Sequence, residues 1–206
     1  MIVAISRAYG ANGKAVGAAV AADLGYRVVD EELPRLAALR LGTSTDVVRG
    51  IEDRAAGIGE RIARALAPAH PETGNATVLP LDDPLVAEYR LEVDRLVHES
   101  AAAGNVVIVG RFAGAILGAR PDLVRVFVRA ALPWRIAAVR AALGCDEARA
   151  RSEIARVDGS RRSFARAAYD LAWGEPGSYD AVLDTSRFGV AGTAAVIAAA
   201  VRAAAP

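Results

Sequence analysis

Five short apolar runs, separated by stretches with helical periodicity, constrain the fold of this chain more than any other feature. The runs lie at 1–6, 26–29, 105–109, 123–128 and 180–183. Runs so short and so rich in β-branched residues are typical of buried strands. Strands that alternate with helices pair in parallel through right-handed crossovers. The pattern therefore predicts an α/β fold, a doubly wound five-stranded parallel sheet flanked by helices, with ligands at the carboxyl ends of the strands.

The intervening segments predict helices at about 14–24, from Arg35 to Gly42, at 46–66 after a cap at 43–45, at 82–103, over 133–171 and from about 190. In the arginine-rich 133–171 stretch, one break is expected, at Asp158-Gly159-Ser160. Prolines, Gly74 and Asn75 predict a flexible loop at 68–84. The length of 206 residues suits one domain.

Charge and composition exclude several classes of protein. The net charge of +1 lacks the basic excess of proteins that bind nucleic acid through its phosphates. Five apolar residues before Ser6 are too few for a signal peptide or a membrane span, so we expect a cytoplasmic protein. The single cysteine, Cys145, allows no internal disulfide, and neither His70 nor His98 has partners at metal-ligand spacing. No protein metal site is expected.

The segment after the first run nearly matches a phosphate-binding loop. Its sequence, Ala8-Tyr-Gly-Ala-Asn-Gly-Lys-Ala15, resembles G-x-x-x-x-G-K-S/T, with alanine in place of the first glycine and of the final hydroxyl residue. Such a loop presents backbone N–H groups to phosphate at a helix N-terminus, where the helix dipole adds about half a positive charge. The predicted phosphate-binding residues are Gly10, Ala11, Asn12, Gly13, Lys14 and Ala15.

Lys14 is the one lysine among 25 basic residues, the other 24 being arginine. A lysine here would reach the β- and γ-phosphates of a bound nucleotide. The alternative is a plain turn followed by a solvated lysine. A cation at a helix N-terminus is mildly unfavourable unless an anion binds there, which favours the phosphate loop.

Several longer segments resemble a known family. The chain contains ISRAYGANGKAVG, LGYRVVDEEL, VVIVGRFAGAIL, RVFVRAALPWRI and VDGSRRSFARAAYDLAWGEPGSYDAVLDTSRFG. Together they resemble the cytidylate kinase-like family, a branch of the P-loop nucleoside monophosphate kinases. The resemblance implies a single P-loop kinase domain over 1–206, an acceptor-side helical insertion at about 43–103 and an arginine-rich helical lid at about 145–172.

The resemblance also implies roles for individual residues. Arg111 corresponds to a contact of the acceptor phosphate, Asp30 resembles the aspartate that opens the acceptor region, and Arg35 is assigned to the same side. Arg161 and Arg166 correspond to lid arginines that act in catalysis with Lys14, and Arg162 shares a helix face with Arg166. Without the resemblance, these lid arginines would suit a solvated face with weak ion pairs.

We expect an ATP-dependent phosphotransferase that acts on a nucleoside monophosphate, CMP or dCMP by resemblance. Because Ala15 lacks a hydroxyl group, Mg²⁺ would be held mainly by ATP phosphates and water, with Ser6 or Asp30 as candidate ligands. Partners are expected to be small-molecule nucleotides. The alternatives are a nucleotide-binding sensor without turnover, suggested by Ala15 and by Arg129 where cytidylate kinases carry an acidic residue, and a kinase for a non-nucleotide small acceptor.

Overall fold

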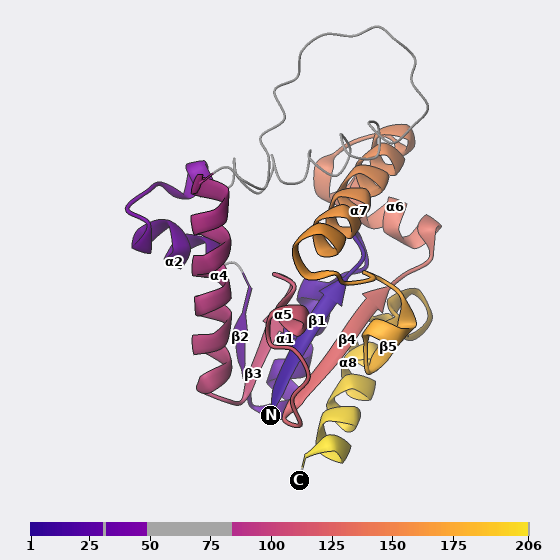
Figure 1. Ribbon diagram of the computed structural model, residues 1–206. Helices are drawn as coiled ribbons and strands as arrows, with labels where there is room; N and C mark the ends of the chain where they lie inside the picture. Colours follow the sequence, from indigo (N-terminus) through magenta and orange to yellow (C-terminus); the bar gives the residue numbers. More distant parts are fainter. Residues whose placement is uncertain (31, 49–83, 206) are drawn as a thin grey trace, which may run out of the picture.

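Five parallel strands form one sheet in the order β2-β3-β1-β4-β5 (Figure 1). The structure is a computed structural model that describes residues 1–30, 32–48 and 84–205. The strands are β1 (Ile2–Arg7), β2 (Arg27–Val29), β3 (Val106–Val109), β4 (Leu123–Arg129) and β5 (Ala181–Asp184). The helices are α1 (Gly13–Leu24), α2 (Glu32–Arg40), α4 (Pro84–Ala102), α5 (Ala113–Ile116), α6 (Leu132–Leu143), α7 (Glu147–Tyr169), the short η1 (Pro176–Ser178) and α8 (Thr185–Ala204). The predicted doubly wound fold is confirmed.

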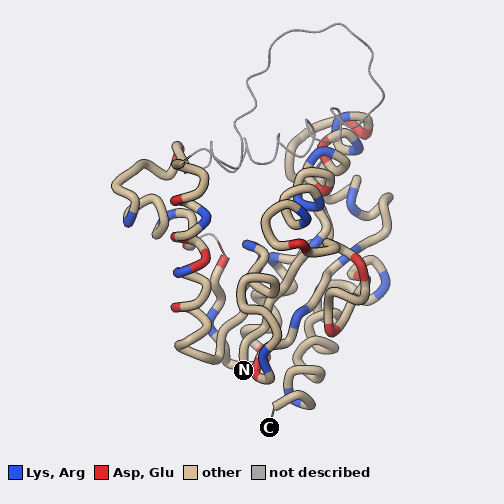
Figure 2. The backbone as a smooth tube through the Cα atoms, viewed as in Figure 1, with Lys and Arg blue, Asp and Glu red and all other residues tan. Residues whose placement is uncertain are grey.

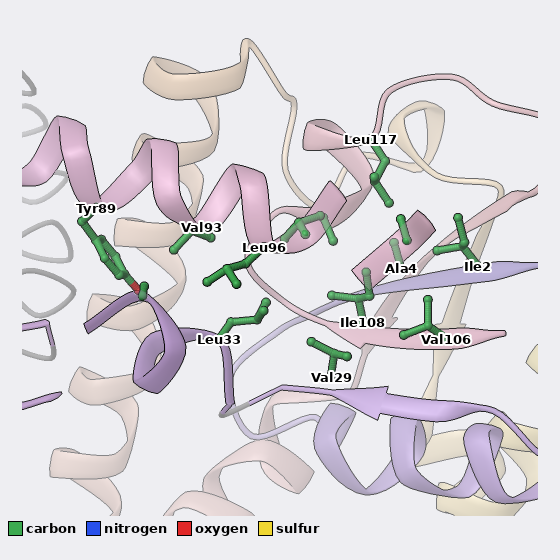
Figure 3. Packing of buried hydrophobic residues seen from close by; sticks show 14 of the residues in the cluster. Ile2, Ala4, Val29, Leu33, Tyr89, Val93, Leu96, Val106, Ile108 and Leu117 are labelled. Atoms are coloured by element: carbon green, nitrogen blue, oxygen red, sulfur yellow. The ribbon is translucent and has the colours of Figure 1, made fainter. Parts of the chain in front are cut away.

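Helices cover both faces of the sheet. Successive side chains of β1 point to opposite faces, so Val3 and Ile5 pack toward α1 and α8 while Ile2 packs on the other side. On that second face, Leu33 of α2 and Leu96 of α4 are buried in the same cluster as Ile2 (Figure 3). Because helices pack on both faces, the strand ends at the carboxyl edge of the sheet are held in fixed positions.

Helices α6 and α7 form a hairpin beyond the carboxyl ends of β1 and β4 (Figure 1). Ile136 and Val139 of α6 pack on Ala150 and Ile154 of α7 in a small separate core. Basic and acidic residues are interspersed along α7 (Figure 2). Helix α7 occupies most of the range expected for the lid.

The predicted break at Asp158-Gly159-Ser160 is wrong, because α7 is continuous from Glu147 to Tyr169. The helix begins at an Asp146 cap, whose side chain accepts a hydrogen bond from the Arg149 N–H. The Asp158 carboxylate does not turn the chain, since it bonds to groups outside the helix. One glycine within a long packed helix costs about 1 kcal/mol, which packing readily offsets.

The predicted helical insertion falls partly outside the described residues. Residues 45–48 are helical, and Ser44 caps them by accepting a hydrogen bond from the Val47 N–H. The remainder of the expected 46–66 helix and nearly all of the 68–84 loop lie at 49–83, outside the described residues. Helix α4 then begins at Pro84, close to the predicted start, and ends before Gly104.

Helix α8 includes a short first part from Thr185, and non-helical Gly189 separates it from the longer part, which begins at 190 as predicted. The helix is long and apolar enough to cross a membrane on length and composition alone. Ala194, Ile197 and Val201, however, are buried in the core cluster beside α1. This packing buries one side of α8, and 28% of its apolar stretch is buried in total.

Asp180 ties the start of β5 to β4. Its carboxylate accepts hydrogen bonds from the backbone N–H and the guanidinium of Arg125, at 2.7 and 2.8 Å. The bonds from the Arg125 side chain hold the pKa of Asp180 below 3.8, although burial opposes them. The pair therefore stabilises the fold above pH 3.8, and this contribution is lost as the pH falls through the lowered pKa.

We expect Asp180→Asn to lower the urea midpoint at pH 7, and the difference from the unchanged protein to shrink below pH 3.8. Circular dichroism at a series of pH values would measure both midpoints. Equal urea midpoints for the two proteins at pH 7 would show that the charge of Asp180 contributes nothing.

Candidate functional site

The loop between β1 and α1 is a tight turn that ends at the N-terminus of the helix. Gly10 and Asn12 have positive φ angles of 79° and 56°, which reverse the chain before α1 begins at Gly13. The Asn12 side chain makes no capping hydrogen bond, and the first helical bond runs from the Val16 N–H to the Asn12 carbonyl. The N–H groups of residues 13–15 thus precede the first intrahelical bond, as donors at a helix N-terminus do.

The strand side of the loop is fixed by the neighbouring elements. The Ala8 N–H donates to the Val128 carbonyl at 2.9 Å. The fully buried Thr185 hydroxyl lies 3.0 Å from the Ala11 carbonyl oxygen and 3.1 Å from that of Arg129. The loop is therefore held in one conformation although Ala8 stands where phosphate loops have their first glycine.

Helices α6 and α7 hold the other side of the loop through the backbone of Tyr9. The Tyr9 N–H donates to Asp158 Oδ1 at 2.9 Å, and Arg135 Nε donates to the Tyr9 carbonyl at 2.7 Å. Arg135 and Asp158 are themselves joined by a short ion pair, with side chains that are 14% and 13% exposed. Gly10 lies against α6 so closely that a Cβ atom there would be 2.9 Å from the Arg135 carbonyl oxygen.

Arg161 joins the lid to the end of β1. Its Nη1 donates to the Arg7 carbonyl at 2.9 Å, and its guanidinium lies 5.9 Å from the centre of the Tyr9 ring. Asp158 lies 3.9 Å away on the same helix. Burial and repulsion from Arg7 lower the pKa of Arg161 to about 10, with a smaller contribution from Arg111. Three arginines thus meet at the carboxyl edge of the sheet.

Arg7 is a residue that the sequence analysis did not assign to the site. Its guanidinium lies against Gly110 at the end of β3, where any Cβ atom would overlap Nη1. It also lies 3.9 Å from the Asp30 carboxylate at the end of β2. Burial lowers the pKa of Arg7, and the attraction of Asp30 opposes this shift. The signal available in the sequence was its place at the end of the first apolar run, directly before the loop.

A family model described as the cytidylate kinase-like family matches residues 2–187. The chain belongs to this family. Membership supports a kinase-type phosphotransferase, and the predicted family is confirmed. Comparison with curated proteins finds no significant match.

Solved structures share the fold at low identity. An uncharacterized protein from Eubacterium ventriosum is 18% identical, with a TM-score of 0.68 and coverage of 98% of each chain. Shikimate kinase from Bacteroides thetaiotaomicron is 13% identical, with a TM-score of 0.52 and coverage of 98% of each chain. TT1252 from Thermus thermophilus is 22% identical, with a TM-score of 0.52 and coverage of 98% of this chain and 96% of its own.

The remaining residues that the family resemblance implied are spread over the carboxyl side of the molecule. Arg111 follows β3 directly, with a positive φ of 54°, and its charge repels Arg161. Lys14 is exposed in the first turn of α1, beside the equally exposed Ala15. Arg35 is exposed on α2.

Two of the predicted lid arginines lie on the outer side of α7. Arg162 is exposed, and the side chain of Arg166 is 70% exposed and pairs with Asp170 at 2.9 Å. Among the contacts of the described residues, Arg161 reaches the loop and these two arginines do not. Of the three predicted lid arginines, Arg161 is therefore the one that contacts the end of β1 and lies near Tyr9.

A magnesium ion would find few protein ligands in the described part of the chain. Residues 1–30, 32–48 and 84–205 contain no group of three or more His, Cys, Asp or Glu side chains arranged to hold a metal ion. Ser6 is engaged by Tyr179, whereas the Asp30 carboxylate is 13% exposed at the carboxyl edge. The Asp30 carboxylate also faces the Arg7 guanidinium at 3.9 Å, so ATP phosphates and water would supply most of the ligands that magnesium prefers.

Proposed function

We propose that the protein transfers the γ-phosphoryl group of ATP to a nucleoside monophosphate, CMP or dCMP by resemblance. The observation that carries this proposal is the meeting of the loop at residues 10–15 with Arg7 and Arg161 at one edge of the sheet. Phosphoryl transfer requires aligned reactants and neutralised charge rather than a covalent group of the protein. The family supports the reaction class.

The donor side of the site uses the backbone and Lys14. The N–H groups of residues 13–15 and the ammonium group of Lys14 would bind the β- and γ-phosphates of ATP. When bound, Mg²⁺ supplies positive charge to the donor phosphates. Thr185 keeps the loop in place from below through the Ala11 carbonyl.

The acceptor side lies toward β2 and β3. Arg111 would bind the phosphate of the acceptor, and Asp30 and Arg35 stand at the start of the acceptor region. Arg129, at the end of β4, pairs with Asp184 at 3.2 Å. This pair neutralises part of the arginine charge at the position where cytidylate kinases carry an acidic residue. We propose a cytoplasmic location for this reaction, in keeping with the family.

The test combines calorimetry with turnover. The unchanged protein should bind ATP and ADP, and a coupled assay should detect ADP release with CMP or dCMP above the rates with UMP, AMP or buffer. Replacing Lys14 with alanine removes a charged donor and should weaken ATP binding about 10- to 100-fold. Arg120→Ala is the matched control, because Arg120 pairs with Asp122 at the opposite end of β4.

Two other results would favour a different function. ATP binding without turnover of any acceptor would favour the sensor, which the missing hydroxyl at Ala15 suggests. Turnover with a non-nucleotide alcohol would favour a kinase for another small acceptor. No binding of ATP, ADP or GTP would contradict all three functions.

A further inference from the structure

We propose that Arg7 is a catalytic residue that binds the γ-phosphoryl group of ATP through its guanidinium, from the strand beneath the loop rather than from the lid. This inference rests on the proposed function and extends it to a residue that neither the loop pattern nor the lid includes. It follows from the path of the side chain, the charges around it and the elements that it connects.

The Arg7 side chain runs from the donor loop toward the acceptor side. Its Cβ and Cγ atoms lie under Gly13, where an added Cβ would be 2.6 and 2.7 Å from them. Its guanidinium then reaches Gly110, whose N–H donates to the Ile5 carbonyl at 2.8 Å. Since β3 lies between β1 and β2, the charged end is placed between the loop and Asp30. A phosphoryl group in transfer must cross this region.

The Arg7 side chain lies so close to the backbone at two positions that both must be glycine. Gly13 leaves room for the stem of Arg7, and Gly110 leaves room for its guanidinium. Gly110 also has a positive φ of 84°, which side chains rarely adopt. The backbone at both ends of the side chain is thus shaped around Arg7.

The charged side chains around Arg7 favour the binding of an anion beside its guanidinium. Asp30 is its ion-pair partner at 3.9 Å, too far for a hydrogen bond. Arg161 is bound to the Arg7 carbonyl, and its positive charge faces Arg7. Asp158 likewise lies 3.9 Å from Arg161, so an entering anion could approach the two guanidinium groups more closely than either carboxylate does. A phosphate group suits this position because the guanidinium fork can donate to two of its oxygens.

The decisive measurement is the affinity for MgATP compared with that for MgADP, which differ by the γ-phosphate. Arg7→Met keeps the stem under Gly13 and the carbonyl that binds Arg161, but removes the charge. We expect this variant to bind ATP about 10- to 100-fold more weakly and to retain its affinity for ADP. Arg7→Lys, which keeps a charge but loses the fork, should give an intermediate loss.

Arg125→Met is the matched control. Arg125 also lies on an interior strand and pairs with an aspartate, Asp180, but it stands near the opposite end of β4. Its replacement should leave the ratio of ATP to ADP affinity unchanged. Thermal unfolding of each variant would confirm that it is folded, and Arg7→Lys serves if Arg7→Met is not.

The possible results of this binding experiment distinguish a failure of the Arg7 inference from a failure of the proposed function. Equal weakening of ATP and ADP binding in the Arg7 variants would show that Arg7 supports the fold of the loop, and unchanged affinities for both nucleotides would place the γ-phosphate elsewhere. Either result overturns the inference while nucleotide binding by the unchanged protein still supports the proposed function. An unchanged protein that binds neither nucleotide would overturn both.

Discussion

Replacing Asp158 with alanine should lower the free energy of unfolding by about 3–5 kcal/mol, the usual cost of removing one partner from a buried ion pair. The Asp158 carboxylate accepts hydrogen bonds from Arg135 and from the Tyr9 N–H, and both donors are largely shielded from water. The variant leaves a charge and an amide without their acceptor. Urea unfolding followed by circular dichroism would measure the change.

Hydrogen exchange should show where the loss occurs. Amides of α6 and α7 should exchange faster in Asp158→Ala, because the lid hairpin has its own small core and is joined to the loop through this carboxylate. Asp122→Ala is the control, since Asp122 pairs with Arg120 on the surface, where ion pairs contribute up to about 1 kcal/mol. The double variant Asp158→Ala with Arg135→Met should recover part of the loss; additive losses would refute the coupling.

Replacing Arg161 with methionine should reduce kcat about 10³-fold, the lower range for an arginine that neutralises a transferring phosphoryl group. Arg161 is held at the end of β1 by its bond to the Arg7 carbonyl and by the Tyr9 ring. Its side chain remains 25% exposed, so its other N–H groups can face a bound nucleotide. Steady-state kinetics with the acceptor found in the coupled assay would measure the effect.

Arg151→Met is the control for Arg161, because it lies on the same helix and pairs with Glu147 on the surface. Its kcat should match that of the unchanged protein. An Arg161 variant with a raised KM and an unaltered kcat would contradict a role in the transition state, since that pattern reports uniform loss of binding.

The sheet could be predicted from the sequence because its signals are local. Each strand is a short β-branched run, and each interval is long enough for a crossover helix. The break at Asp158-Gly159-Ser160 was predicted from equally local signals and was wrong. In the structure, the Asp158 side chain instead accepts a hydrogen bond from the Tyr9 N–H, 149 positions away in the chain. Local helix propensities contain no information about a hydrogen-bond partner so distant in the sequence.

The position of the loop could be predicted from the sequence, but the sequence did not show which of the nearby arginines point toward the loop. Spacing places Arg162 and Arg166 on one helix face, but packing of α7 against the loop determines that Arg161 lies inward and Arg166 outward. Arg7 could not be assigned because its direction depends on Gly110 and Asp30, each from another strand. Sequence patterns thus located the region, and side-chain direction within it required the structure.

The α6–α7 hairpin binds the backbone of residue 9, with Asp158 accepting from the N–H and Arg135 donating to the carbonyl. Every amino acid except proline has both a backbone N–H and a backbone carbonyl, and proline lacks the N–H. These two backbone hydrogen bonds therefore survive any change of side chain at position 9 except to proline, whereas the packing of the Tyr9 ring near Arg161 depends on the side chain. In a saturation library at this codon, proline should cause the largest loss of stability.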